Sequence, residues 1–100
     1  MPLSVFRKRR SSGRAEEPRS WPRILLYSSK WCPACWWTKL FLNRHDAPYH
    51  ELDIDRDPEA ALKVMEINDG FRSVPTLVIE GYGAITEPSN GELARILEID

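Results

Sequence analysis

The sequence predicts one small α/β domain, with a four-stranded mixed sheet flanked by three helices in the order β-α-β-α-β-β-α. Short apolar runs of strand length alternate with segments that carry helix-start signals, which is typical of a β-α-β unit with parallel strands. Late in the chain, two strand-like segments flank a glycine-containing turn, which adds an antiparallel edge. A chain of 100 residues, of which 42% are hydrophobic and 29% charged, suits one globular domain with a modest core.

The chain divides by charge near Trp21. Residues 1–23 hold seven Lys and Arg against two Glu, a net charge of +5, whereas residues 24–100 hold seven against thirteen acidic residues, a net of −6, and together these give −1. The low apolar content of the first segment predicts a basic, disordered extension over residues 1–22, followed by a folded domain over residues 23–100. A solvated tail is the simplest interpretation of the extension, and binding to nucleic acid is the alternative.

The sequence also indicates a compartment. No apolar run reaches the length of about 18 residues that a membrane span needs, and no apolar signal region follows the basic start. We therefore expect a cytoplasmic monomer with no membrane partner. Because that compartment is reducing, a purely structural disulfide is not expected there.

The first β-α-β unit is expected over residues 23–54. Residues 23–28 (RILLYS) are a short apolar run that predicts a buried strand. A helix is expected over residues 33–44, because Pro33 suits the first turn, where a missing N–H costs nothing. Residues 49–54 (YHELDI) alternate polar and apolar side chains as a strand does.

The second half of the chain supplies a further helix and a hairpin. Residues 57–68 begin with Asp57, a natural N-cap, and with Pro58 at the first helical position. Residues 76–80 (TLVIE) predict a strand. The glycines that follow form a turn, from which residues 84–86 return as an antiparallel strand.

A capping box marks the last helix. Ser89 and Glu92 have the S-x-x-E spacing in which each side chain caps the backbone of the other residue. The helical segment 93–99 (LARILEI) follows it and completes the set of three helices.

Cys32 and Cys35 are the only two cysteines of the chain, and they fall between the first strand and the first helix. Free N–H groups and the partial positive charge at a helix start favour a thiolate at Cys32. Cys35, one turn inside the helix, is placed to attack a mixed disulfide on Cys32. A C-x-x-C motif beside a β-α-β unit predicts a redox-active dithiol. A structural staple does not fit, because so short a loop removes little entropy from the unfolded chain.

A zinc site is the competing interpretation of these cysteines. His45 and His50 complete a C-x2-C-x9-H-x4-H pattern, but Pro48 interrupts the segment between the two histidines. A 12-residue helix is about 18 Å long, so both histidines would lie far from the cysteines. We expect no metal, with His45 at a helix C-terminus and His50 at an exposed strand position.

Three tryptophans surround the cysteine pair. Trp31 is expected to flank the site. Trp36 with Leu40, and Trp37 with Phe41, form apolar pairs at i, i+4 on the predicted helix. At least one of Trp36 and Trp37 is therefore expected either in the core or on a flat docking surface for a protein partner.

Three motifs together resemble a known family. They are WCPAC at residues 31–35, SVP at 73–75 and ITEPSNGEL at 85–93. They are similar to glutaredoxin-like proteins of the thioredoxin fold, nearest to the mycoredoxin branch of actinobacteria, which works with mycothiol. The resemblance covers residues 23–98, and the CPxC motif differs from the CGPC of thioredoxin itself.

The resemblance implies a cis peptide bond between Val74 and Pro75, placed beside Cys32, where the cysteine moiety of a bound thiol pairs with the Val74 backbone as an added strand. It also implies that Lys30, and more weakly Arg72, neutralise a carboxylate of the thiol or that Lys30 stabilises the Cys32 thiolate; simple exposure is the alternative for Lys30. The thiol-binding residues implied in this way are Lys30, Trp31, Pro33, Arg72, Ser73, Val74, Pro75, Thr86, Glu87, Pro88 and Ser89.

The segment 86–89 (TEPS) corresponds to the part of glutaredoxins that holds the γ-glutamyl end of glutathione. The usual glycine pair and aspartate are missing from it, and it resembles the mycoredoxin form instead. The implied reducing co-substrate is therefore mycothiol, with glutathione as the alternative, and no bound cofactor is expected.

The expected activity is thiol–disulfide exchange. Cys32 attacks mixed disulfides between proteins and a small thiol, and Cys35 is the resolving thiol. One alternative is a thioredoxin-like dithiol electron donor that a flavoprotein reduces. An alternative of another class is an iron–sulfur or zinc module in which Cys32 and Cys35 bridge two chains.

Overall fold

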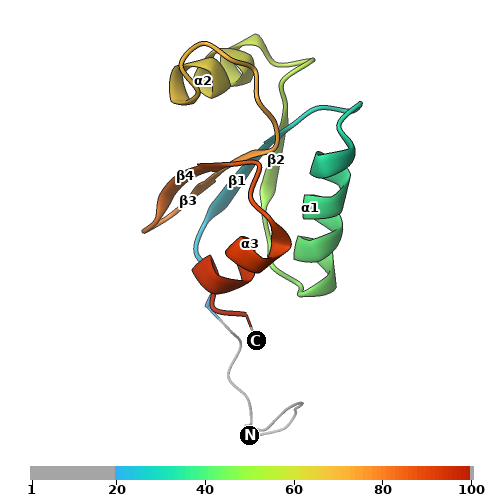
Figure 1. The fold of residues 1–100 in the computed structure, drawn as a ribbon, viewed down its shortest axis with the longest axis vertical. Coiled ribbons are helices and arrows are strands. Elements are labelled where there is room, and N and C mark those ends of the chain that lie inside the picture. Colours follow the sequence, from blue (N-terminus) through green and yellow to red (C-terminus); the bar gives the residue numbers. More distant parts are fainter. Residues whose placement is uncertain (1–19, 100) are drawn as a thin grey trace, which may run out of the picture.

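The computed structural model describes residues 20–99, which form a mixed four-stranded sheet with three helices (Figure 1). The predicted α/β class and the order β-α-β-α-β-β-α are confirmed. The elements are β1 (Ile24–Ser28), α1 (Pro33–Arg44), β2 (His50–Asp53), α2 (Pro58–Ile67), β3 (Thr76–Ile79), β4 (Gly83–Thr86) and α3 (Asn90–Ile96).

The sheet has the strand order β2-β1-β3-β4. β1 pairs with β2 in parallel, and both the β1–β3 and the β3–β4 pairs are antiparallel. The carboxyl ends of β1 and β2 therefore lie at the same edge, and the amino end of β3 meets them there. The loops that leave or enter the sheet at this edge carry the cysteines and residues 73–75.

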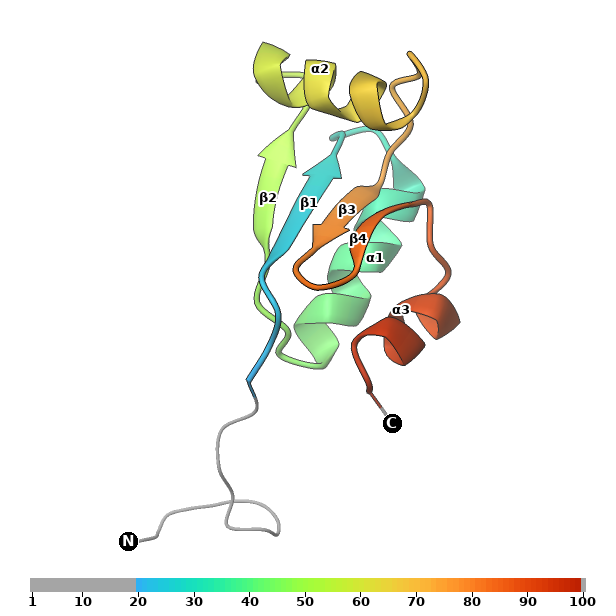
Figure 2. The same ribbon diagram turned by 90° about the vertical axis from the view of Figure 1, so that its left-hand side faces the viewer.

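Helices cover both faces of the sheet (Figure 2). α1 and α3 enclose the larger core, in which Leu26, Leu42, Leu77 and Leu93 are fully buried. Tyr27 lies on the other side of β1, in a smaller cluster with Ala60, Ala61 and Val64 of α2. The alternation along β1 explains this division, because successive side chains of a strand point to opposite faces.

Both N-caps that the sequence marks are formed. Asp57 Oδ1 accepts hydrogen bonds from the backbone N–H groups of Glu59 (3.1 Å) and Ala60 (3.2 Å). Ser89 and Glu92 cap each other reciprocally, so α3 begins at Asn90, directly after the cap, and ends at Ile96. The start of the helix agrees with the predicted capping box, and the helix ends at Ile96, before the end of the apolar segment 93–99.

The predicted basic extension, residues 1–22, lies mostly outside the described residues. Trp21, which the charge pattern places in that extension, packs against the core cluster of α1 and α3. No helix among residues 20–99 combines the length and the apolar surface that crossing a membrane requires.

Candidate functional site

Cys32 is the N-cap residue of α1, and its sulfur points at the first turn of that helix. Cys32 Sγ accepts a hydrogen bond from the backbone N–H of Cys35 at 3.1 Å. Pro33 occupies the first helical position, as predicted. The side chain is half-buried, so a substrate disulfide can reach the sulfur.

Cys35 is the opposite case, because it is 1% exposed and faces the protein interior. Burial, and next the adjacent sulfur of Cys32, raise the pKa of the Cys35 thiol from an ordinary value of 9.0 to about 12. Both cysteines are free thiols in this structure. The pair therefore consists of one accessible sulfur and one buried thiol that stays protonated at neutral pH.

The loop before β3 lies directly beside Cys32. The Val74–Pro75 peptide bond is cis, which is the geometry that the family resemblance implies. The Cys32 thiol donates to the Val74 carbonyl at 3.5 Å between sulfur and oxygen. On the next residue, the Pro75 carbonyl accepts a hydrogen bond of 2.7 Å from the Glu87 N–H. The fold thus brings Cys32, the Val74–Pro75 bond and the start of segment 86–89 together.

Within segment 86–89, most side chains have structural contacts of their own. The Thr86 hydroxyl donates to Asn68 Oδ1 at 2.7 Å, Pro88 is buried, and Ser89 caps α3. Glu87 has an exposed side chain on a backbone with φ of 51°. Glu87 is therefore the residue of this segment whose side chain faces solvent beside the cis-proline loop without an internal role among residues 20–99.

The two basic residues of the implied thiol site, Lys30 and Arg72, have different surroundings. Lys30 is exposed, and its Nζ lies 5.7 Å from the centre of the Trp31 ring, which is itself 83% exposed. The Arg72 guanidinium donates to the Ile54 carbonyl at 3.3 Å and lies 3.9 Å from Asp55 Oδ1. Trp31 flanks Cys32 as expected, whereas the contacts of Arg72 within residues 20–99 are with the turn after β2 and not with Cys32.

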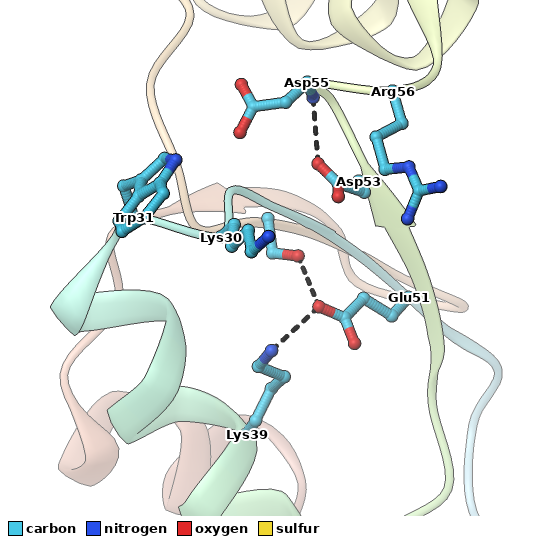
Figure 3. Close-up of a pocket in the computed structure, with 8 residues that line it drawn as sticks. Lys30, Trp31, Lys39, Glu51, Asp53, Asp55 and Arg56 are labelled. Carbon is cyan, nitrogen blue, oxygen red and sulfur yellow. Dashed lines mark hydrogen bonds and ion pairs between the residues drawn. The ribbon is translucent and has the colours of Figure 1, made fainter.

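A polar cavity of about 760 Å³ opens beside Trp31 (Figure 3). It lies between the β1–α1 loop, α1 and the carboxyl end of β2. Its lining residues are Ser28, Lys30, Trp31, Lys39, Glu51, Asp53, Asp55 and Arg56. Apart from Lys30 and Trp31, sequence analysis did not single out these residues, because they come from three elements and share no local motif.

A partly exposed ion-pair network forms one wall of the cavity. Glu51 Oε2 accepts hydrogen bonds from Ser28 Oγ at 2.6 Å and from Lys39 Nζ at 2.9 Å. Burial by itself disfavours the Glu51 carboxylate, but the bonds from Ser28 and Lys39 outweigh it and lower the pKa of Glu51. The hydrogen bond to Glu51 raises the pKa of Lys39. Both groups are therefore charged at neutral pH and hold each other in place.

The histidines lie where the non-metal interpretation places them. His45 is the C-cap of α1, where its ring lies tilted against that of Phe41 with the ring centres 4.7 Å apart, and His50 is exposed at the start of β2. Within residues 20–99, no group of three His, Cys, Asp or Glu side chains is arranged to hold a metal ion.

Comparison with known proteins identifies the family. The family model for glutaredoxin matches residues 24–82, which include both cysteines and the cis-proline loop. The chain belongs to the glutaredoxin family. This glutaredoxin is 32% identical to mycoredoxin 1 of Corynebacterium glutamicum, over 75% of this chain and 92% of that protein.

Two solved structures are also similar to this glutaredoxin. A thioredoxin-like protein superposes with a TM-score of 0.69 at 30% identity, over 77% of this chain and 96% of that one. The glutaredoxin-like NrdH-redoxin of Escherichia coli gives 0.62 at 27% identity, over 74% and 93%. The thioredoxin-like fold and the activity class, thiol–disulfide oxidoreductase, are thereby confirmed. Members of the family act on thiols and disulfides and need no prosthetic group.

Trp36 and Trp37 of this glutaredoxin do not enter the core. Both are 56% exposed, and their rings pack edge to face with centres 4.9 Å apart. The buried residues of α1 are Cys35, Thr38 and Leu42 instead. The prediction that one of the two tryptophans lies in the core was therefore wrong. The i, i+4 spacing shows which side chains are neighbours on a helix, but it does not show which face of the helix packs against the sheet.

A hydrogen-bond network centred on Asn68 supports the cis-proline loop and was missed by sequence analysis. Asn68 Nδ2 donates to the Val64 carbonyl (2.9 Å) and to Thr76 Oγ1 (3.2 Å), and Asn68 Oδ1 accepts from Thr86. The Thr76 hydroxyl donates in turn to the Ser73 carbonyl at 2.8 Å, next to Val74. An asparagine at a helix end is an ordinary C-cap signal, so the sequence carried no sign of these long-range partners.

Replacing Asn68 by alanine is expected to destabilise this glutaredoxin by about 2 kcal/mol, because the partly buried groups of Thr86 and Val64 lose their partner. Urea denaturation measures the loss. Asn43→Ala is the matched control, since Asn43 is exposed on α1 and should change stability by less than about 0.5 kcal/mol. Equal unfolding midpoints for the two variants would contradict a structural role for the network.

Proposed function

We propose that this glutaredoxin reduces mixed disulfides between proteins and a low-molecular-weight thiol, with mycothiol as the favoured thiol and glutathione as the alternative. The observation that carries the proposal is the position of the Cys32 sulfur. This sulfur is partly accessible, accepts a hydrogen bond from the Cys35 N–H and lies next to the Val74 carbonyl. We expect the protein to act in the cytoplasm and as a monomer. The domain from residue 23 onward carries it, without a contribution from the basic extension.

The proposed reaction consists of two thiol–disulfide exchanges. The Cys32 thiolate attacks the sulfur of the small thiol, the substrate protein leaves as a thiolate that takes up a proton, and Cys32 now carries the small thiol. The thiolate of a second small-thiol molecule attacks that bound sulfur. The two small thiols leave as a symmetric disulfide, and Cys32 is regenerated as a thiolate.

The loop at Val74 is proposed to hold the bound thiol. Once Cys32 is in a mixed disulfide it has no S–H to donate, so the Val74 carbonyl is released from the bond that it accepts in this structure. The backbone of Val74 can then pair with the cysteine moiety of the ligand, as an added strand pairs with a sheet edge. Exposed Glu87 and Lys30 are the neighbouring charged groups within reach of the remainder of the ligand.

Cys35 is proposed as an auxiliary resolving thiol. Its pKa of about 12 leaves very little thiolate at neutral pH, and the thiolate is the attacking species. Release of Cys32 by a second small thiol is proposed as the main route. Closure of a Cys32–Cys35 disulfide is the side route.

One observation favours a second candidate function, a dithiol electron donor reduced by a flavoprotein. The similar NrdH-redoxin of Escherichia coli is described as a glutaredoxin-like protein with a thioredoxin-like activity profile. In this candidate function, the protein alternates between the reduced dithiol and an intramolecular Cys32–Cys35 disulfide.

Tryptophan fluorescence distinguishes the two candidates, because Trp31 adjoins Cys32 and Trp36 adjoins Cys35. The oxidised protein is mixed separately with mycothiol, with glutathione, or with thioredoxin reductase and its cofactor. We expect rapid recovery of the reduced signal with mycothiol and little with the reductase. Recovery with the reductase alone would replace the proposal by the dithiol carrier. The Cys32→Ser variant, which cannot form the disulfide, is the control and should show no change.

A further inference from the structure

We propose that the Lys39–Glu51 ion pair governs how readily Cys35 closes the disulfide with Cys32, because Lys39 promotes loss of the Cys35 proton and Glu51 restrains Lys39. Both are positioning residues, since they act on the exchange through Cys35. They lie outside the three motifs of the sequence. The role rests on the proposed function in one respect only, that Cys32 first carries a thiol, and both candidate functions include the closing step.

Lys39 lies one helical turn after Cys35 on α1. Residues four apart lie on one face of a helix, and a long side chain points back toward the helix N-terminus, so the Lys39 side chain extends toward Cys35. Cys35 is fully buried, whereas the Lys39 side chain is 29% exposed and lines the polar cavity. Lys39 therefore connects the face of α1 that holds the buried thiol with a cavity that is open to solvent.

Glu51 holds the ammonium group of Lys39 from the neighbouring strand. Figure 3 shows the Lys39 side chain reaching from α1 to Glu51 on β2, where Nζ and Oε2 are 2.9 Å apart. The same oxygen accepts from the hydroxyl of buried Ser28 at 2.6 Å, so the carboxylate is fixed from two sides. The hydrogen bond to Glu51 raises the pKa of Lys39, with a smaller contribution from Tyr49, so Lys39 stays charged. A carboxylate this close offsets much of the positive field that Lys39 exerts on Cys35.

Few groups act on the Cys35 thiol. Burial and the sulfur of Cys32 raise its pKa, whereas the backbone of Ser29 and the positive charge of Lys39 lower it. Once Cys32 carries a small thiol, its sulfur has neither a charge nor an S–H, and its effect on Cys35 is lost. Among these groups of the described chain, Lys39 is then the charged side chain that acts directly on Cys35.

The closing step is an intramolecular thiol–disulfide exchange. Cys35 loses its proton to water, and its thiolate attacks the Cys32 sulfur of the mixed disulfide. The Cys32–Cys35 bond forms and the bond to the small thiol breaks, so Cys35 is oxidised and the small thiol is reduced; it leaves as a thiolate that takes up a proton. Because the thiolate is the attacking species, the rate of closure follows the ionised fraction of Cys35, which Lys39 increases.

Two variants that each remove one charge should change closure in opposite directions. Dithiodipyridine, an uncharged disulfide, reacts first with Cys32 and releases one light-absorbing thiopyridone, and closure by Cys35 releases a second at a rate independent of protein concentration. At pH 8, Glu51→Gln should speed this second phase by about five-fold, and Lys39→Met should slow it by about five-fold. Lys39→Arg keeps the charge and should close at nearly the wild-type rate.

The titration of Cys35 itself is the second readout, because a merely structural disturbance would not move it in opposite directions. In a Cys32→Ser background Cys35 is the remaining thiol, and the chemical shift of its Cβ carbon follows deprotonation as the pH is raised. Glu51→Gln should lower the midpoint of this titration, and Lys39→Met should raise it.

The exposed Lys63–Glu66 ion pair supplies matched controls on α2, which covers the other face of the sheet (Figure 2). Lys63→Met and Glu66→Gln make the same charge changes and should leave closure unaltered. Equal effects from these controls, same-direction effects of the two cavity variants, or an unmoved Cys35 titration would overturn the inference. Wild-type protein that exchanges with small thiols but shows no second phase would overturn it and leave the proposed function standing. A missing first phase would overturn both.

Discussion

Replacing Cys32 by serine should abolish reduction of mixed disulfides, with a fall in kcat/KM of at least about a thousand-fold to the uncatalysed level. Serine at the N-cap can still accept the Cys35 N–H, so the fold is retained while the nucleophilic sulfur is lost. Cys35→Ser should keep the rate within about three-fold of wild type, because a second small thiol releases Cys32. The assay follows release of the small thiol from a thiolated protein.

The two variants are informative as a pair. Mass spectrometry of Cys35→Ser after one turnover without added thiol should find the small thiol on Cys32. An equal loss of activity in both variants would contradict the route through a second small thiol, and closure by Cys35 would then be the obligatory step.

The reduced protein is expected to lose stability in alkaline solution through Cys35. The pKa of this thiol is about 12 in the folded state against an ordinary 9.0, so the folded state holds the proton more tightly than the unfolded chain does. Below pH 9 both states keep the proton and the contribution is fully present. Between pH 9 and pH 12 the unfolded chain loses its proton first, and stability should fall by about 1.4 kcal/mol per pH unit.

Urea denaturation between pH 8 and pH 11, with reductant present, measures this slope. The Cys35→Ala variant is the control, because it lacks the titrating thiol while lysines and tyrosines still titrate as in wild type. We expect the difference in stability between the two proteins to shift steadily in favour of the variant above pH 9. A difference that stays constant with pH would show that burial does not disfavour the Cys35 thiolate.

The features that the sequence predicted correctly are local in the chain. Pro33, Asp57 and Ser89 mark helix starts because N-caps and first-turn prolines act within one turn of the helix. The alternation of strands and helices predicted the topology, because the two strands of a β-α-β unit pair in parallel through a right-handed crossover. The assignment of Cys32 and Cys35 to one redox site stays a prediction, and it is also local, because only two residues separate the cysteines.

The position of Val74–Pro75 beside Cys32 came from resemblance to a family and not from any local pattern. The two segments are more than 40 residues apart, and the sulfur–carbonyl contact of 3.5 Å exists only because β1 and β3 are neighbours in the sheet. The outward position of Trp36 and Trp37 has a similar cause, since the packing of α1 and not its own pattern decided which face is buried.

The sequence by itself therefore determined the fold class and the order of the elements, because these depend on short-range backbone preferences, and it predicted the reacting cysteines from their spacing. Only the tertiary structure decided the protonation of Cys35, the Asn68 network and the charged cavity. Each of these depends on burial or on contacts between β1, α1, β2 and later elements, which are distant in the chain. Burial and electrostatic balance arise from the packed whole, so no single segment of the sequence reveals them.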